Sequence, residues 1–150
     1  MKKSVKVLIS IFNEKSGWTL PSQYTDAIAA TDGVELWVVK SRAELEKRLP
    51  EAEVFFGWGL APEELPDAGS LRWIQLATAG ADRMLTDEFA KSDVVLTTAS
   101  GVHAIQISEH VLAMMLMFAR RMHEYMTAQA DARWDRDPSS RLDELYERTL

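Results

Sequence analysis

The sequence predicts an α/β protein built on a doubly wound parallel sheet. Short apolar segments rich in β-branched and aromatic residues alternate with segments that carry helical caps and helical spacing. The strand candidates are apolar at nearly every position rather than at alternate ones, which indicates strands covered on both faces. Such strands are typical of a parallel sheet that lies between two layers of helices.

Length and composition agree with one α/β domain. The chain has 150 residues, of which 47% are hydrophobic and 27% charged, and its formal net charge is −6. It is long enough to bury one core and too short for two ordinary domains. The negative charge argues against nucleic-acid and anionic-membrane partners, because both attract basic surfaces. The absence of cysteine excludes disulfides and suits a reducing, cytoplasmic location.

The segment 1–40 predicts two strands around one helix. The first expected strand is Val5–Ile11 and the second is Val34–Val39. Between them, Pro21 suits the first turn of a helix and Gly33 lies just beyond its end. Three residues at helical spacing form the expected apolar face of this helix: Leu20, Tyr24 and Ile28.

A capping box begins the next helix. Ser41 and Glu44 have the spacing at which the serine bonds forward and the glutamate bonds back, and the helix should run through Leu49. Three further strands are expected, with helical turns at 62–67 and 86–90 between them: Ala52–Phe56, Trp73–Leu76 and Val94–Thr97. Five strands in about 100 residues fit a flavodoxin-like strand order.

Small residues follow three of these strands, in Gly57-Trp58-Gly59, Ala77–Ala81 and Ala99-Ser100-Gly101. Open parallel sheets bind ligands at the carboxyl ends of their strands. If Ala77–Ala81 leads directly into a helix, its backbone N–H groups form a site that attracts an anion such as a carboxylate. The alternative is a close-packed turn, and Trp58 is either a core aromatic residue or the wall of a pocket.

The remainder of the chain differs from this pattern. A long helix is expected at about 103–126, with apolar residues on nearly every side, so that a second domain or a second subunit must cover it. The segment 127–150 is charged and interrupted at Pro138, which indicates a linker or an arm. We therefore expect an α/β domain at 1–102, a helix at 103–126 and an arm at 127–150.

Two long motifs resemble those of the D-isomer-specific 2-hydroxyacid dehydrogenases. They are LRWIQLATAGADRM and, about twenty residues later, TTASGVHAIQISEHVLAMMLMFARRM. The first motif matches the family pattern at Leu71, Trp73, Ile74, Gln75, Ala79, Gly80 and Asp82. The second matches at Gly101, Val102, Ala104, Glu109, His110, Leu112, Leu116, Ala119 and Arg120. The resemblance extends over essentially the whole chain.

The resemblance implies that this chain is the substrate-binding portion of a larger enzyme. Family members join a flavodoxin-like domain, completed by the returning C-terminus, to a Rossmann NAD(P) domain that holds most of the hydride-transfer machinery. The sequence contains no Gly-x-Gly-x-x-Gly segment. We therefore expect NAD or NADP in the full-length enzyme only, no catalytic residue in this chain, no metal site and no activity of the chain alone.

The resemblance also assigns roles to residues of this sequence. Backbone N–H groups of Ala79, Gly80 and Ala81 would bind the carboxylate of a small 2-oxo or 2-hydroxy acid, and the Gly57-Trp58 loop would face its side group. Four further positions are expected at the cleft, the first three near the substrate and the last near the cofactor: Ser100, Gly101, His103 and Gln106.

Other interpretations of the sequence remain. Family members pair through the helix at 103–126, so a homodimer is expected. A free-standing dimerisation or small-anion-binding module is the alternative from a non-enzyme class. A receiver domain would need an acidic pair where Ile11-Phe12-Asn13 stands and an Asp where Gly57-Trp58-Gly59 stands. A flavodoxin would need a hydroxyl-rich loop after the first strand. His110 and His123 suit structural roles, because their spacing fits no metal site.

Overall fold

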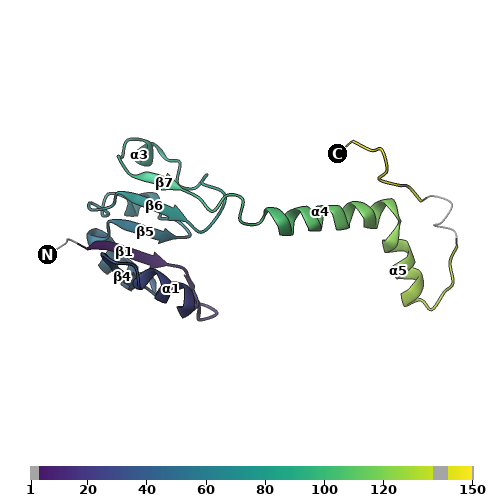
Figure 1. Cartoon of the computed structure of the whole chain (residues 1–150), viewed down its shortest axis with the longest axis horizontal. Helices are drawn as coiled ribbons and strands as arrows, with labels where there is room; N and C mark the ends of the chain where they lie inside the picture. The colour runs from purple at the N-terminus through teal and green to yellow at the C-terminus, as the bar shows by residue number, and fades with distance from the viewer. Residues whose placement is uncertain (1–3, 137–141, 150) are drawn as a thin grey trace. The chain divides into compact units, whose positions relative to one another are not determined.

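The computed structural model describes residues 4–136 and 142–149. The chain divides into two compact units, Met1–Gly101 and Val102–Leu150. The first unit holds the sheet, and the second holds two helices (Figure 1).

A five-stranded parallel sheet forms the first unit, with strand order β4-β1-β5-β6-β7. The strands are β1 (Val5–Ser10), β4 (Val34–Val38), β5 (Val54–Gly57), β6 (Trp73–Leu76) and β7 (Val95–Thr97). All five predicted strands are present to within two residues at each end. The second of them lies outside the first, so the flavodoxin-like order is confirmed.

One face of the sheet carries the core. Leu8, Phe55 and Ile74 lie side by side on β1, β5 and β6, and none of them is exposed. The helix α2 (Arg42–Arg48) and the 3-10 turn η1 (Leu49–Glu51) contribute Leu45 and Leu49 to the same cluster. Burial of these side chains is the main stabilising contribution to the first unit.

The opposite face is less covered at β6 and β7. The row Val7, Val54, Trp73 and Val95 crosses the sheet there. Trp73 is 42% exposed and Val95 is 59% exposed. A strand of a parallel sheet is ordinarily buried on both faces, so among the described residues of the first unit this part of the face has no covering helix layer of the kind that its sequence predicts.

The helix α1 (Ser22–Ala29) is present but buries a different residue from those expected. The predicted apolar face included Tyr24, which is 54% exposed, whereas Thr25 is the buried residue. Leu20 lies before the first helical residue, so its spacing from Tyr24 does not place the two on one helical face. The Thr25 hydroxyl donates a hydrogen bond to the Ser22 carbonyl (3.0 Å), which satisfies it within the helix.

The predicted cap of α2 is present with one change. Ser41 Oγ accepts a hydrogen bond from the Glu44 backbone N–H (3.3 Å), as expected. The Glu44 carboxylate accepts from the N–H of Lys40 (2.8 Å), one residue before the position that a capping box predicts. The other expected helical turns form as η2 (Pro62–Glu64) and α3 (Asp87–Ala90).

A small antiparallel hairpin follows β1 and was not predicted. It consists of β2 (Phe12–Asn13) and β3 (Trp18–Thr19). Asn13 Oδ1 accepts hydrogen bonds from the N–H groups of Lys15 (3.0 Å) and Ser16 (3.2 Å), which closes the turn. Strands of two residues are too short to show a hydrophobic period, so the sequence pattern indicated only a loop.

The second unit contains two helices where the sequence predicted one. α4 (Ala104–Ala119) ends at Arg120, and α5 (Met122–Ala130) begins after Arg121, whose φ of 52° is left-handed. The prediction of a continuous helix over 103–126 is therefore wrong (Figure 1). Arginine has a high helix propensity, and for this reason the composition gave no indication of a break.

The predicted arm is shorter than 127–150, because α5 continues to Ala130. Pro138, where the sequence suggested an interruption, lies outside the described residues. Among the helices of the described part of the chain, none combines the length and the apolar character needed to cross a membrane.

Candidate functional site

The predicted small-residue loops share one edge of the sheet. Because the five strands are parallel, their carboxyl ends meet at this edge. The N–H of Ala77 donates to the Gly57 carbonyl (2.7 Å), and the N–H of Ala99 donates to the Thr78 carbonyl (2.9 Å). The loops after β5, β6 and β7 are thus hydrogen-bonded to one another.

Close packing in the core leaves no space for a side chain at residue 57. A Cβ atom at this position would lie 2.6 Å from the Phe55 ring and 2.6 Å from the Ser10 carbonyl oxygen, which is closer than non-bonded atoms approach. Gly57 is itself buried. Packing between β5 and β1 therefore explains this glycine without a ligand.

Gly80 lies in open space. A Cβ atom there would meet only the Asp82 carboxylate, at an ordinary distance of 3.5 Å, and the residue does not have a positive φ. Neither packing nor backbone conformation requires a glycine. The space that its missing side chain leaves is at the exposed surface of the loop, where a ligand could approach the backbone.

The loop Ala77–Ala81, hereafter the bare loop, has free hydrogen-bond donors. Among the described residues, no group accepts a hydrogen bond from the N–H of Ala79, Gly80 or Ala81. The Thr78 hydroxyl donates to the Gly80 carbonyl (3.0 Å), and this bond holds the loop in shape. Three adjacent free N–H groups of this kind can bind an anion.

The expectation that the bare loop leads directly into a helix is wrong. Residues 82–84 form a turn, and α3 begins only at Asp87. A helix dipole therefore does not contribute at the bare loop, because its effect is confined to the first turn. Any attraction for an anion comes from the loop amides themselves and from nearby side chains.

The start of α3 is already occupied by its own side chains. Thr86 Oγ1 accepts a hydrogen bond from the Phe89 N–H (3.2 Å). The backbone N–H of Glu88, followed by the Thr86 hydroxyl, holds the pKa of the Glu88 carboxyl below its ordinary value. Backbone N–H groups at the start of α3 thus donate to side chains of the same turn. In contrast, the N–H groups of Ala79, Gly80 and Ala81 donate to no group among the described residues.

A hollow of about 370 Å³ lies against the bare loop, hereafter the loop hollow. Trp58, Gly80 and Ala81 line it, and their role at a substrate site stays a prediction. Trp58 is 51% exposed, which identifies it as a wall and not a core residue. The lining also includes Arg83, which was not predicted from the sequence and which has no ion-pair partner among the described residues.

The other predicted site residues are not in this hollow. Ser100 and Gly101 follow β7 and are exposed, and Gly101 has a φ of 89°. His103 and Gln106 belong to the second unit, immediately before and within the first turn of α4, and both are exposed. Their roles at a cleft stay predictions.

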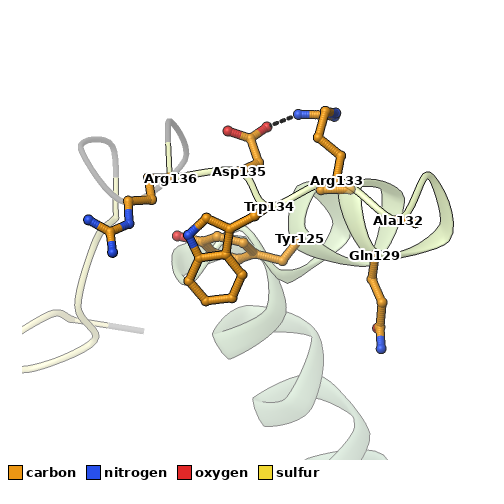
Figure 2. Close-up of a pocket in the computed structure, with 8 residues that line it drawn as sticks. Tyr125, Gln129, Ala132, Arg133, Trp134, Asp135 and Arg136 are labelled. Atoms are coloured by element: carbon orange, nitrogen blue, oxygen red, sulfur yellow. Dashed lines mark hydrogen bonds and ion pairs between the residues drawn. The ribbon is translucent and has the colours of Figure 1, made fainter.

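The second unit has a hollow of its own, of about 620 Å³ (Figure 2). Tyr125 of α5 and Trp134 line it, with their rings close together in the view, and Arg133 is paired with Asp135. Trp134 is 86% exposed. In the described part of the chain, His, Asp and Glu side chains form no cluster suited to a metal ion.

Comparison with known proteins extends these observations. No protein-family model matches the sequence. A D-isomer-specific 2-hydroxyacid dehydrogenase family protein from Aeromonas salmonicida is similar in structure, with a TM-score of 0.70 and 22% identity over 89% of this chain. D-lactate dehydrogenase from Aquifex aeolicus, solved with NAD and lactic acid, has a TM-score of 0.66 and 18% identity over 93% of this chain.

A third similar structure is the NADPH-dependent glyoxylate/hydroxypyruvate reductase of Sinorhizobium meliloti, with a TM-score of 0.64 and 22% identity over 88% of this chain. This chain has the fold found in D-2-hydroxyacid dehydrogenases. This chain spans only 40–41% of the length of each of these three proteins.

Proposed function

We propose that this chain is the substrate-binding portion of an NAD(P)-dependent D-2-hydroxyacid dehydrogenase. The bare loop carries the proposal, because its free N–H groups lie at the carboxyl edge of the sheet in a dehydrogenase fold. The carboxylate of a 2-oxo or 2-hydroxy acid accepts hydrogen bonds from Ala79, Gly80 and Ala81. Charge-assisted bonds of this kind are about twice as strong as neutral ones.

The residues around the loop hollow orient the bound acid. Arg83 adds a positive charge beside the loop donors, and Trp58 forms the wall toward the side group of the substrate. The hydrogen bond from Thr78 to the Gly80 carbonyl keeps the donors in position. Preorganised donors bind an anion more tightly, because no ordering is required when it arrives.

We expect the chain's own residues to form no dinucleotide site. The sequence has no Gly-x-Gly-x-x-Gly segment, and Gln106, which the resemblance places near the cofactor, is exposed on α4. NAD or NADP, which supplies hydride transfer, would bind a Rossmann domain in the full-length enzyme. We expect no cofactor binding and no hydride transfer by the 150-residue chain.

Uncovered apolar surface supports a larger assembly. Trp73 and Val95 are exposed on the sheet, as expected if the returning C-terminus of the full-length enzyme completes this domain. The helices of the second unit expose a series of large apolar side chains over the predicted dimer region 103–126. They are Ile105, Ile107, Val111, Leu112, Leu116, Phe118, Met122 and Met126. A homodimer through these helices would bury them.

Two measurements on the ¹⁵N-labelled chain test the proposal. Addition of D-lactate or pyruvate should shift the amide signals of Ala79, Gly80 and Ala81 at millimolar concentrations, while amides at the amino ends of the strands stay fixed. Calorimetry with NADH should detect no binding. If the bare-loop amides do not shift, the proposed carboxylate site is wrong. If the chain binds NADH with micromolar affinity, the proposal that a separate Rossmann domain binds the cofactor is wrong.

A free-standing small-anion-binding or dimerisation module is the second candidate. The free N–H groups and Arg83 favour it, since they would bind any small anion. Acetate distinguishes the two functions: a module binds acetate as well as D-lactate, whereas a substrate site favours the 2-hydroxy acid. Turnover of NADH with 2-oxo acids by a longer product of the same gene would establish the dehydrogenase.

A further inference from the structure

A second hollow adjoins the site, of about 710 Å³, hereafter the hairpin hollow. It lies where β1 and β5 end, and Ser10, Trp58 and Gly59 belong to its lining. Trp58 lines the loop hollow as well. Trp58 thus belongs both to the hollow at the bare loop and to a larger space on the β1 side of the same sheet edge. A substrate held by its carboxylate at the bare loop can extend its side group past Trp58 into this space.

The hairpin between β2 and β3 supplies polar groups to this hollow. Asn13, Glu14 and Lys15 line it. The Asn13 oxygen is engaged by the N–H groups of Lys15 and Ser16, which leaves the amide NH₂ group to donate. One oxygen of Glu14 accepts from the backbone N–H of Arg42 (2.7 Å), which fixes the carboxylate against α2.

Charge in the hairpin hollow is balanced. Arg42 also lines it, but its guanidinium lies 2.8 Å from a Glu64 carboxylate oxygen and 3.3 Å from one of Glu46. Among the described residues, Lys15 has no ion-pair partner, and Glu14 accepts only from a neutral N–H. The hollow therefore offers one ammonium donor and one carboxylate acceptor, next to each other in sequence.

This combination selects the chemistry of a side group. An apolar group would remove water from the donors and acceptors without replacing its hydrogen bonds, which is costly. A second carboxylate would be attracted by Lys15 but repelled by Glu14. A hydroxyl group both donates and accepts, so neighbouring hydroxyls can satisfy the ammonium and the carboxylate together. Phe12, Leu45 and Trp58 also line the hollow, and this apolar surface suits the carbon chain that carries the hydroxyls.

We propose that the hairpin hollow binds a polyhydroxylated side group, so that sugar acids of the aldonic type are the substrate class of this site. The inference rests on the proposed function, because the carboxylate of the sugar acid is the group held at the bare loop. The volume of the hollow suits this class, since a side group of one or two carbons would leave most of it to water.

Three acids that share the 2-hydroxycarboxylate group test the inference on the ¹⁵N-labelled chain. They are D-lactate, D-2-hydroxyglutarate and D-gluconate. All three should shift the amides of the bare loop. Only D-gluconate should also shift the amides of Asn13, Glu14 and Lys15, and it should bind roughly tenfold more tightly than D-lactate. If D-gluconate shifts the bare loop alone, or if D-2-hydroxyglutarate shifts the hairpin as strongly, the side-group assignment is wrong while the proposed function stands. If no acid shifts the bare loop, the proposed function fails and the inference fails with it.

A pair of lysine variants gives an independent readout. Lys15→Ala removes the ammonium donor and should weaken D-gluconate binding by roughly tenfold, the loss expected for one hydrogen bond to a charged group. Binding of D-lactate should be unchanged. Lys47→Ala, on the exposed side of α2 and outside the hollow, is the matched control and should alter neither. Equal losses for D-gluconate and D-lactate in Lys15→Ala would also overturn the inference.

Discussion

The two units of this chain use apolar residues in opposite ways. In the first unit, apolar side chains from β1, β5 and β6 form a continuous buried cluster with α2. In the second unit, Ala128 is the one apolar residue that reaches full burial within the described chain. α4 is at least as apolar as the strands, yet most of its residues are exposed. Hydrophobicity alone therefore does not show where a chain is stable.

The difference predicts that stability and association depend on different parts of the molecule. The first unit encloses its own core, which is the main source of folding free energy. The second unit presents apolar surface that only another surface can cover. Substitutions in the first unit should change unfolding, and substitutions in the second should change assembly.

The largest expected effect is a difference in unfolding free energy between alanine variants of two phenylalanines, one buried and one exposed. Phe55→Ala removes a fully buried ring from the sheet and should lower the free energy of unfolding by about 3–5 kcal/mol. Phe118→Ala, at a position 58% exposed on α4, should change it by less than about 0.5 kcal/mol. Urea unfolding followed by circular dichroism measures both. A loss at Phe118 as large as that at Phe55 would contradict the contrast between the units.

The next effect concerns assembly. Leu112→Glu with Leu116→Glu places two charges on α4 without a loss of helix propensity, and should weaken self-association by a factor on the order of 100. Sedimentation velocity measures this change, and the urea midpoint of the first unit should stay fixed. Leu85→Glu, at a position 65% exposed in the first unit, is the control. A wild-type chain that is monomeric at micromolar concentration would remove the proposed dimer.

Two glycines at the candidate site differ in the same way, because Gly57 is closely packed and Gly80 faces open space. Gly57→Ala forces a methyl group against the Phe55 ring and the Ser10 carbonyl, and should cost about 1–3 kcal/mol of stability. Gly80→Ala meets open space and should cost less than about 0.5 kcal/mol. It should nevertheless weaken D-lactate binding, because the methyl group occupies the approach to the loop amides. Unchanged binding in Gly80→Ala would indicate that the ligand does not contact this loop.

The smallest effect is a pH dependence at exposed ion pairs of both units. The hydrogen bond from Lys6 to Glu51 (2.5 Å) lowers the pKa of the Glu51 carboxyl. The backbone N–H of Glu144, followed by the guanidinium of Arg148, lowers the pKa of Asp143. A lowered carboxyl pKa stabilises the folded chain at neutral pH, and this contribution is lost as the pH falls through the folded-state pKa. Both groups are exposed, so the loss should be slight.

Carboxyl ¹³C titrations distinguish the causes of the two shifts. Lys6→Gln should return the pKa of Glu51 close to its ordinary value, because Lys6 is the main cause of the shift. Arg148→Gln should raise the pKa of Asp143 only partly, since the Glu144 N–H remains. High salt should reproduce most of the first change and little of the second.

Much of the first unit follows from local sequence patterns. The strand candidates are short, apolar and bounded by turn residues, so their positions and their parallel arrangement were predicted correctly. Ser41 and Thr86 mark helix starts, because an N-cap is a local interaction between neighbouring residues. The hairpin at Phe12–Asn13 and Trp18–Thr19 was missed, since it is too short for a periodic signal.

At the candidate site, the sequence indicated the edge of the sheet and the small residues there. It did not show why each of those positions holds a small residue. Gly57 and Gly80 look alike in sequence. One is crowded by a ring and a carbonyl from a neighbouring strand, and the other faces open space. Arg83 and the hairpin residues enter the site only through the fold.

The sequence by itself determined the class of fold and the positions of the strands and of the bare loop, because these depend on local periodicity, on caps and on residue size. Only the tertiary structure decided that α4 ends near Arg120, that no helix follows the bare loop directly, and that Trp58 lines two hollows. Those features depend on contacts between residues far apart in the chain, which no local pattern records.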